Sequence, residues 1–430
     1  MNNYKKIILD NGIPLYLYQD PSMKQVFVNY IIKYGYSGEW FKFSLDGKDY
    51  NVGAGYAHFL EHILLKSSRR GDLTTYFNQK GYENNAYTKR DVTSFYFCGI
   101  KDIKESIKEL IEAIDNPSFN EEDIEKERPS IIEECRMFDS AHQNKLSTLT
   151  ENNLFGGVDI YDDSLVPIGN VKTQKSINLD NLKACYDAFY TDNNKVLVIG
   201  GNLNEKEVVN YINEIYKNIE KHDSRVILPE YDYSPIKNKS ERLYKRGYPD
   251  LYSFGVKVKV PEDIDIKDAF LISKVLLKLD YSMVHSLNLI DQAEVICMEI
   301  VGDYVEFINT VATKNGIEYY SKFIELLKEK DITEIDFYAL KKMILSESLR
   351  QLDNKYLPLL QFSDSMFYTE DYSDIDYFKD LEYDKFKYVI DTLDYSNYVR
   401  GKLTDSSNKD KKLAKVKKIE RYPLDIFFTK

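Results

Sequence analysis

The sequence predicts an α+β fold in more than one domain. Its 430 residues are too many for one ordinary hydrophobic core and suggest two to four domains. Segments with strand-like and helix-like patterns recur in both halves of the chain, an arrangement typical of α+β proteins. A hydrophobic fraction of 43% is that of a globular protein.

Composition excludes several classes of partner. A net charge of -12 and a pI near 5.2 argue against nucleic acid. No stretch approaches the length of a membrane span, and the apolar run at residues 7–9 is too short for a signal peptide. The four cysteines are far apart in sequence and are expected to be reduced, buried thiols. We therefore expect a cytoplasmic protein that binds neither nucleic acid nor membrane.

The first half of the chain alternates between strand-like and helix-like patterns. Asn11-Gly12 between apolar runs predicts a hairpin, and β-branched and aromatic residues predict a strand at 26–34. Apolar residues at helical spacing predict a helix at 103–114. The remaining expectations are a polar loop at 36–51, a short helix at 71–81, a loop at 84–88, a strand at 92–97, and helix over most of 121–154.

The second half follows a charged, proline-containing linker. We expect a strand at 251–260, a helix at 269–279, and two paired strands at 294–300 and 304–311 around Gly302. The basic run at 409–418 is interpreted as a solvated face.

The most informative stretch is Ala57-His58-Phe59-Leu60-Glu61-His62-Ile63-Leu64. On a helix, His58 and His62 lie one turn apart on one face, so that both imidazoles can bind one metal ion. Glu61 completes the order H-x-x-E-H, the inverted zinc-protease motif. Catalytic zinc sites keep one coordination position open, and a nearby carboxylate can take a proton from water.

The alternative is that these are ordinary residues of an amphipathic helix, so a third ligand is required. The segment 121–154 carries several glutamates, most of which we assign to a solvated face. Glu127 and Glu134 differ because they are seven residues apart and share one face. Ile131 and Ile132 between them indicate that part of this helix is buried, so an acidic residue here could reach a metal held by the two histidines.

These motifs, in this order, resemble those of the pitrilysin-like zinc metallopeptidases (family M16). The matching segments are Leu9–Gly12, Gly55–His62, Asn85–Thr88, Thr93, Tyr96, Glu125–Arg128, Glu133–Glu134, Pro167–Gly169, Phe189–Tyr190, Asn193–Asn194 and Val196–Gly201. The resemblance implies two similar M16-type domains, each an antiparallel sheet of about five to six strands covered by helices. We place them at residues 1–222 and 241–430, with a linker at 223–240.

The resemblance also implies a zinc metalloendopeptidase that hydrolyses peptides or unfolded segments inside a closed chamber. One Zn²⁺ per chain would be held by His58, His62 and Glu134, with Glu133 as the alternative third ligand. Glu61 would be the general base, Glu127 an accompanying catalytic carboxylate, and Asn85, Ala86 and Thr88 would contact the substrate.

Two features depart from the family pattern. Pro129 interrupts the helix that carries Glu127 and Glu134, so we expect a kink or a helix restart there. Family members usually draw an arginine and a tyrosine from a second domain, but residues 282–304 contain no arginine. We therefore expect a second M16-like chain as partner, in a heterodimer rather than a homodimer. The alternative function is a non-catalytic partner subunit, which the intact H-x-x-E-H disfavours.

Overall fold

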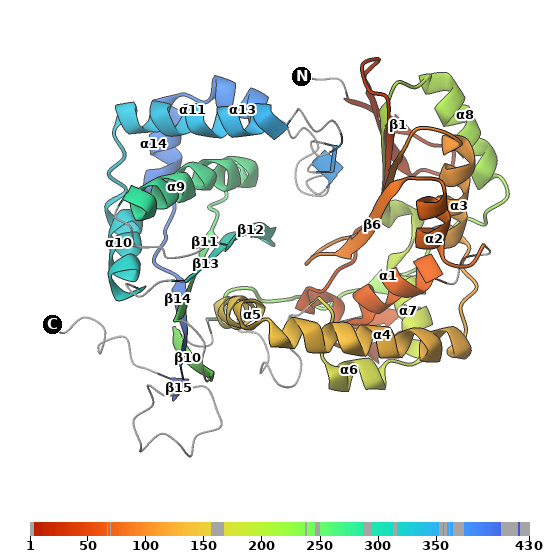
Figure 1. Cartoon of the computed structure of the whole chain (residues 1–430), viewed down its shortest axis with the longest axis horizontal. Helices are drawn as coiled ribbons and strands as arrows, with labels where there is room; N and C mark the ends of the chain where they lie inside the picture. The colour runs from red at the N-terminus through yellow and green to blue at the C-terminus, as the bar shows by residue number, and fades with distance from the viewer. Residues whose placement is uncertain are drawn as a thin grey trace. The chain divides into compact units, whose positions relative to one another are not determined.

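The computed structural model describes most of the chain as two compact units (Figure 1). The described residues are 4–66, 68, 70–155, 167–236, 239–245, 250–286, 295–312, 316–351, 356, 359–360, 362–363, 374–405 and 420–421. The first unit comprises residues 1–136, 165–231 and 350–373, and the second comprises 137–164, 232–349 and 374–430. Each unit thus includes one segment from the other half of the chain. The sequential boundaries 1–222, 223–240 and 241–430 stay a prediction.

The first unit is built on a six-stranded sheet. Its spatial order is β1 (Tyr4–Ile8), β2 (Pro14–Gln19), β8 (Lys195–Gly201), β3 (Val26–Ile32), β7 (Thr93–Gly99) and β6 (Glu83–Thr88). All neighbours pair antiparallel except β2 and β8. The predicted Asn-Gly hairpin joins β1 and β2, with Gly12 at a φ of 98° that favours glycine. The strand β6 therefore forms one edge of the sheet.

The second unit repeats this topology. Its sheet runs β12 (Val295–Val301), β13 (Tyr304–Ala312), β11 (Leu251–Lys259), β14 (Tyr398–Asp405), β10 (Ser240–Lys245) and β15 (Glu420–Arg421). Five strands of the two sheets correspond both in chain order and in space. They are β2, β8, β3, β7 and β6 in the first sheet and β10, β14, β11, β13 and β12 in the second. The parallel pair β10 and β14 also corresponds to β2 and β8. The predicted α+β class with two similar domains is confirmed.

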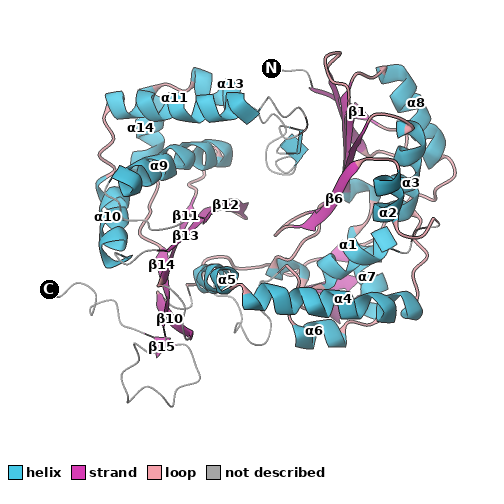
Figure 2. Ribbon diagram, viewed as in Figure 1, coloured by secondary structure: helices cyan, strands magenta, loops and turns pink. Residues whose placement is uncertain are grey.

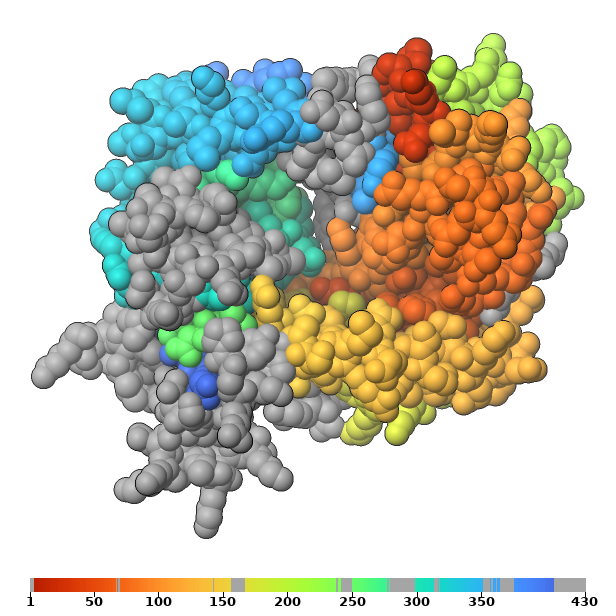
Figure 3. Space-filling model, in the orientation of Figure 1, coloured from red at the N-terminus to blue at the C-terminus, as the bar shows by residue number. Residues whose placement is uncertain are grey.

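Helices cover one face of the first sheet (Figure 2). They are α1 (Tyr56–Lys66), α2 (Leu73–Gln79), α3 (Ile103–Asp115), α4 (Glu121–Ser140), α6 (Val171–Ser176), α7 (Leu179–Phe189) and α8 (Glu205–Tyr216). Their apolar faces form one core with the side chains of β2, β3 and β7 that point the same way. In Figure 3 the side chains of α2, α3 and α4, orange to gold, form a continuous surface on the side of this unit that faces the viewer.

The opposite face of the first sheet is covered by residues from the second half of the chain. Leu359 and Phe362 pack there against Phe27 and Val198. The helices of the second unit are α5 (His142–Leu154), α9 (Ile266–Ser286), α10 (Gly316–Glu329), α11 (Glu334–Gln351), α13 (Asp374–Asp380) and α14 (Tyr383–Thr392). Helix α5 lies on that unit's sheet at Gly255 and Gly401, where an added Cβ would meet its side chains at 2.7 and 2.9 Å. Glycine permits this close approach.

Two local predictions were wrong, and one of the two alternatives for a third is excluded. Residues 36–51 are not a loop but hold η1 (Gly38–Trp40) and a small sheet of β4 (Lys42–Leu45), β5 (Lys48–Asn51) and β9 (Val226–Ile227). The alternation at Lys42–Leu45 and the Asp46-Gly47 turn carry the signal for this hairpin. Residues 84–88 belong to the edge strand β6 rather than to a loop. Helix α4 neither ends nor restarts at Pro129, since it continues to Ser140 as a single element.

Other expectations are confirmed, and some lie outside the described residues. The paired strands around Gly302 form as β12 and β13. Cys98, Cys135 and Cys185 are buried free thiols. Among the described helices none has the length and apolar content needed to cross a bilayer. The basic run at 409–418 lies outside the described residues. The cytoplasmic location stays a prediction.

A buried ion cluster joins the sheet to the helices in the first unit. Lys195 Nζ lies 2.7 Å from Asp115 Oδ1 and 3.6 Å from Asp192 Oδ1, and the Lys195 side chain is fully buried. Asp115 Oδ2 also accepts hydrogen bonds from the hydroxyls of Tyr30 and Tyr216, at 2.7 and 2.9 Å. The carboxylate of Asp115 therefore accepts two hydrogen bonds on Oδ2 and forms an ion pair through Oδ1, and β3, β8, α3 and α8 meet at one charged centre.

We expect Lys195→Met to destabilise the protein by about 3–5 kcal/mol, because the change leaves the Asp115 carboxylate buried without its cation. Urea unfolding monitored by circular dichroism measures the effect. Lys217→Met is the matched control, since Lys217 pairs with Glu214 on an exposed face and such pairs contribute at most about 1 kcal/mol. Equal stability of the two variants would contradict the assigned role of this cluster.

Candidate metal centre

The helix α1 is buried on most of its surface. Its buried residues are Tyr56, Ala57, His58, Phe59, Leu60, Glu61, Ile63 and Leu64. Gly55 precedes it with a φ of 94°, and an added Cβ there would meet Gln174 Nε2 at 2.6 Å and Ile168 O at 3.2 Å. The start of α1 is thus fitted closely against the segment that contains Pro167-Ile168-Gly169, so its position in the core is narrowly defined.

The two histidines of α1 face the same carboxylate. The ring centroids of His58 and His62 are 4.6 Å apart. The Nε2 atom of His58 lies 3.6 Å from Glu134 Oε1, and that of His62 lies 3.5 Å from Glu134 Oε2. These separations are longer than the hydrogen bonds of about 2.7–3.2 Å that such groups form. They match the spacing of roughly 3.3–3.6 Å between ligands that surround zinc at about 2.0–2.2 Å.

Helix α4 brings Glu134 to the histidines and turns Glu133 away. Glu133 Oε2 is bonded to Arg136 Nη1 at 2.8 Å, and both side chains are about 62% exposed. Glu134 is half-buried, and the two imidazoles hold the pKa of its carboxyl far below its usual range through direct contact. The seven-residue spacing from Glu127 thus identified a carboxylate that the structure brings beside His58 and His62.

Glu127 contacts the other side of His62. Its Oε1 lies 2.8 Å from His62 Nδ1, which leaves Nε2 to face Glu134. Burial alone would lower the pKa of His62, but the contacts with Glu127 and Glu134 and the charge of Glu61 raise it to about 9. Carboxylates in this position orient metal-binding histidines in many proteins. The corresponding Nδ1 of His58 is buried and has no hydrogen-bond partner in the described part of the chain.

Glu61 is held by a hydrogen bond that sequence reasoning missed. The hydroxyl of Thr88, on β6, donates to Glu61 Oε2 at 2.7 Å, and both side chains are buried. Thr88 is one of the residues predicted to contact substrate, which stays a prediction, and its hydroxyl is directed to Glu61. Nothing in the local pattern of residues 85–88 marks this contact, because it joins residues 27 positions apart.

Asn85 and Ala86 lie on the same edge strand. They pair with Tyr96 and Phe95 of β7 on the inner side, and β6 has no strand on its outer side in the described sheet. Asn85 is exposed, and Ala86 is half-buried. An open edge of this kind presents a row of backbone N–H and C=O groups that an added strand can pair with.

Arg128 fixes α4 relative to α1 and was not identified from the sequence. Its guanidinium donates to the carbonyl oxygens of Gln174 and, at 2.9 Å, of Ile177, and lies 5.9 Å from the ring centroid of Phe59. It also forms an ion pair with Glu125 at 2.6 Å. Because Arg128 follows Glu127 directly, these contacts hold the turn of α4 that approaches His62.

The donor set fits zinc. Ligand atoms of His58, Glu61 and His62 lie within 4.8 Å of one another, and Glu134 lies beside both imidazoles. Two imidazoles and a carboxylate are the donors found in catalytic zinc sites that keep a fourth position open. The buried, partnerless Nδ1 of His58 is the one polar atom of this set that the described residues leave unsatisfied.

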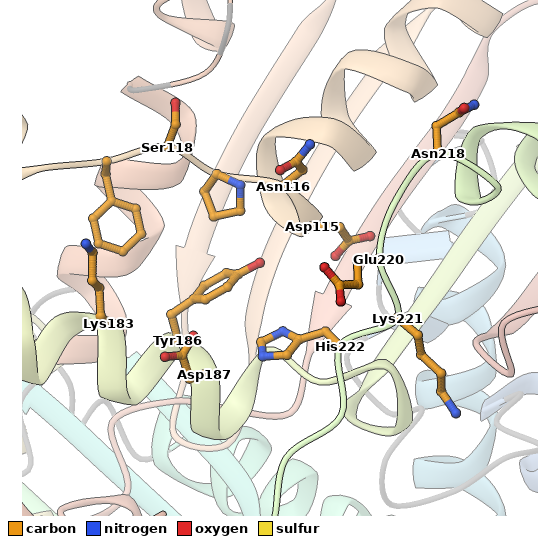
Figure 4. Close-up of a pocket in the computed structure, with 12 residues that line it drawn as sticks. Asp115, Asn116, Ser118, Lys183, Tyr186, Asp187, Asn218, Glu220, Lys221 and His222 are labelled. Atoms are coloured by element: carbon orange, nitrogen blue, oxygen red, sulfur yellow. The ribbon is translucent and has the colours of Figure 1, made fainter.

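A cavity elsewhere in the first unit does not compete as a catalytic site. It measures about 760 Å³ and is lined by residues that include Asp115, Tyr186, Glu220 and His222 (Figure 4). Its most buried carboxylate, Asp115, already accepts from two tyrosines and pairs with Lys195. Glu220 is exposed, so the remaining acid at this wall is solvated. The cavity therefore lacks a free, buried reactive group.

Comparison with known proteins gives two consecutive family matches. Residues 45–157 match the model described as Insulinase (Peptidase family M16), and residues 176–267 match the one described as Peptidase M16 inactive domain. The sequence is 26% identical over 279 residues to "Uncharacterized zinc protease YmfH" of Bacillus subtilis, covering 64% of this chain and 62% of that protein. It is 25% identical over 170 residues to "Mitochondrial-processing peptidase subunit beta" of Dictyostelium discoideum, covering 38% and 36%.

Both matches span less than two thirds of the relative's length. The fold is matched more completely. The crystal structure of an M16-like protein from Alicyclobacillus acidocaldarius superposes with a TM-score of 0.81 at 20% identity, covering 94% of this chain and 98% of that one. This likeness extends the two-unit fold described above over nearly the whole chain.

We expect Glu127→Gln to weaken metal binding by about 10- to 100-fold, because an amide holds the His62 ring less strongly than a carboxylate does. Competition with a chromogenic chelator measures the zinc dissociation constant. Glu133→Gln is the control, since it removes the same charge from the exposed side of the same helix. Unchanged affinity in Glu127→Gln would mean that the contact with His62 does not support the metal.

Proposed function

The chain belongs to peptidase family M16, and from this premise we propose that it is a zinc-dependent metalloendopeptidase. The observation that carries the proposal is the approach of two imidazole Nε2 atoms to one carboxylate at 3.5–3.6 Å. In this proposal His58, His62 and Glu134 hold one Zn²⁺ per chain. Glu127 acts as a positioning residue for His62 rather than as a catalytic group, because it contacts a ligand and not the open side of the site.

Glu61 is the proposed general base. Zinc, when bound, supplies a Lewis acid that polarises the scissile carbonyl and favours ionisation of water. Glu61 Oε2 is occupied by the Thr88 hydroxyl, which leaves Oε1 to receive the proton of the attacking water. The same carboxyl then donates that proton to the departing amine. Burial of Glu61 excludes competing solvent and strengthens its interactions with the reacting groups.

The proposed substrate is a peptide or an unfolded segment that adds to the sheet as an extended strand. The open edge of β6 supports this, since main-chain hydrogen bonds along an edge bind a peptide with little dependence on its sequence. Asn85 and Ala86 would contact the substrate from this edge. The contact between α1 and β6 through Glu61 and Thr88 brings the proposed base to the end of that strand.

We further propose that the active form contains a second chain of the same family. One relative is named as a subunit of a processing peptidase. Residues 282–304 contain no arginine that could bind substrate from a second domain. A heterodimer would supply that group from its partner, whereas a homodimer would lack it on both sides.

The metal assignment predicts one zinc per purified chain and its loss in His62→Ala, because two remaining ligands cannot hold the ion tightly. Glu134→Gln is expected to lower zinc affinity strongly and Glu133→Gln to leave it unchanged. Elemental analysis after dialysis gives the zinc content of each variant. Full retention of zinc in both His58→Ala and His62→Ala would disprove the site, and the reverse order of the two glutamates would move the ligand by one residue.

The base assignment predicts that Glu61→Gln keeps its zinc and loses about 10²–10⁴-fold in peptide hydrolysis, since an amide cannot accept the proton. A quenched fluorescent peptide without stable structure is a suitable substrate, and zinc content is measured on the same sample. Glu133→Gln, on the exposed side of α4, serves as the charge-matched control. Hydrolysis at the rate of the unmodified protein by Glu61→Gln would place the base elsewhere.

The assembly proposal predicts weak hydrolysis by the purified chain alone, because a missing oxyanion donor lowers turnover by about 10²–10³-fold. Light scattering gives the mass in solution, and the same fluorescent peptide gives the activity. A stable homodimer with robust activity would refute the heterodimer and would require another residue of the second unit to supply the donor.

A further inference from the structure

We propose that the hydroxyl of Thr88 keeps Glu61 as a base by holding its carboxylate away from the metal. The inference rests on the proposed zinc peptidase function and concerns the same site. Thr88 is thus a positioning residue, which acts on the reaction through Glu61. Its role differs from the substrate contact expected from the sequence.

The geometry identifies a carboxylate with two possible positions. One ligand atom from each of His58, Glu61 and His62 lies within 4.8 Å of the other two, so a carboxylate oxygen of Glu61 is close enough to both imidazoles to share a metal ion with them. Glu134 already approaches both Nε2 atoms and is the proposed third ligand. A second carboxylate on the metal would occupy the open position that catalysis requires.

Thr88 is the donor that selects between these positions. Its Oγ1 lies 2.7 Å from Glu61 Oε2, a length typical of hydroxyl–carboxylate bonds. Within the described residues it is the one hydrogen bond that the structure shows on the Glu61 carboxylate. The side chains of Thr88 and Glu61 are only 9% and 6% exposed, so water cannot readily replace the hydroxyl. Loss of this donor would leave a buried anion whose nearest remaining partner is the cation.

The contact also connects two elements that the proposed reaction needs together. Thr88 is the last residue of β6, the edge strand on which the peptide is proposed to bind. Glu61 belongs to α1, which carries both histidines. A shift of β6 relative to α1 would therefore move the base, so the position of the edge strand and the orientation of Glu61 depend on one hydrogen bond.

Thr88→Val removes the hydroxyl and keeps the shape of the side chain, whereas Thr88→Ser keeps the hydroxyl. We expect Thr88→Val to bind zinc at least as tightly as the unmodified protein and to lose about 10- to 100-fold in kcat, with little change in KM, because the base is misplaced. The Co²⁺-substituted protein gives a readout independent of turnover. Its visible absorption should change in Thr88→Val as Glu61 becomes a ligand in the open position, and Thr88→Ser should restore both the spectrum and kcat.

Ser94→Ala is the matched control. Ser94 is a fully buried hydroxyl on the neighbouring strand β7, and it donates to Asn29 Oδ1 at 2.7 Å without contacting Glu61. This variant loses a comparable hydrogen bond and should keep the Co²⁺ spectrum and kcat. Thr88→Ala provides a second deletion of the hydroxyl in case Thr88→Val does not fold, and circular dichroism verifies the fold of each variant.

The proposal is overturned if a folded deletion of the hydroxyl keeps the original kcat, keeps the original Co²⁺ spectrum, or behaves like Ser94→Ala. Failure of the proposed function gives a different result. In that case the unmodified protein would bind no zinc or would hydrolyse no peptide when its partner is present. If the unmodified protein is active and Thr88→Val is equally active, the proposed role of Thr88 is disproved and the proposed peptidase function is not affected.

Discussion

The structure depends on the burial of polar side chains in one helix of the first core. His58 and Glu61 are each 6% exposed, although their neighbours in α1 are largely apolar. A buried charge or polar atom is costly unless another group satisfies it. Two elements that are distant in sequence provide the contacts, since Thr88 of β6 bonds Glu61 and Glu134 of α4 lies beside His58, while Glu127 of α4 contacts His62. The positions of β6 and α4 therefore decide whether the buried polar side chains of α1 have partners.

The repeated topology shows that the fold alone does not produce this site. When the five corresponding strands are numbered in chain order, both sheets place them in the spatial order first, fifth, second, fourth, third. This order is β2-β8-β3-β7-β6 in the first sheet and β10-β14-β11-β13-β12 in the second. In the first unit the connection from the second to the third strand, β3 to β6, contains α1 with its two histidines and Glu61. The corresponding connection in the second unit, β11 to β12, contains α9, whose sequence has no H-x-x-E-H. The chemistry therefore depends on side chains added to one copy of a shared framework.

Local sequence patterns predicted those features of the candidate site that depend on helical geometry. The i, i+4 spacing placed His58 and His62 on one helical face, and the seven-residue spacing placed Glu127 and Glu134 on one face of their own helix, because helical periodicity determines both. The choice of Glu134 as the third ligand came from the resemblance to family M16. The hydroxyl of Thr88 and the guanidinium of Arg128 could not be assigned in this way, since their partners lie 27 to 49 residues away. The exchange of segments 137–164 and 350–373 between the units is likewise a long-range property.

Pro129 illustrates the limit of a local rule. A proline removes one backbone hydrogen bond and crowds the preceding turn, which predicts a kink or a restart of the helix. The preceding residue, Arg128, makes contacts with Gln174, Ile177 and Phe59 that hold this turn from outside the helix. Helix α4 runs unbroken from the turn that carries Glu127 to the turn that carries Glu134.

The three carboxylates around α1 differ in partners, which supports the different roles proposed for them. Glu127 contacts the outer nitrogen of His62, Glu134 faces the inner nitrogens of both histidines, and Glu61 is bonded to a hydroxyl. Together they place up to three negative charges beside two imidazoles, an excess that a divalent cation offsets and a second proton offsets less completely. Residue type alone would allow any of the three to bind the metal or to accept a proton. Glu61 is bonded to Thr88 outside the cluster, whereas Glu127 and Glu134 contact the histidines themselves. The strand and the helix that supply these contacts therefore matter as much as the motif itself.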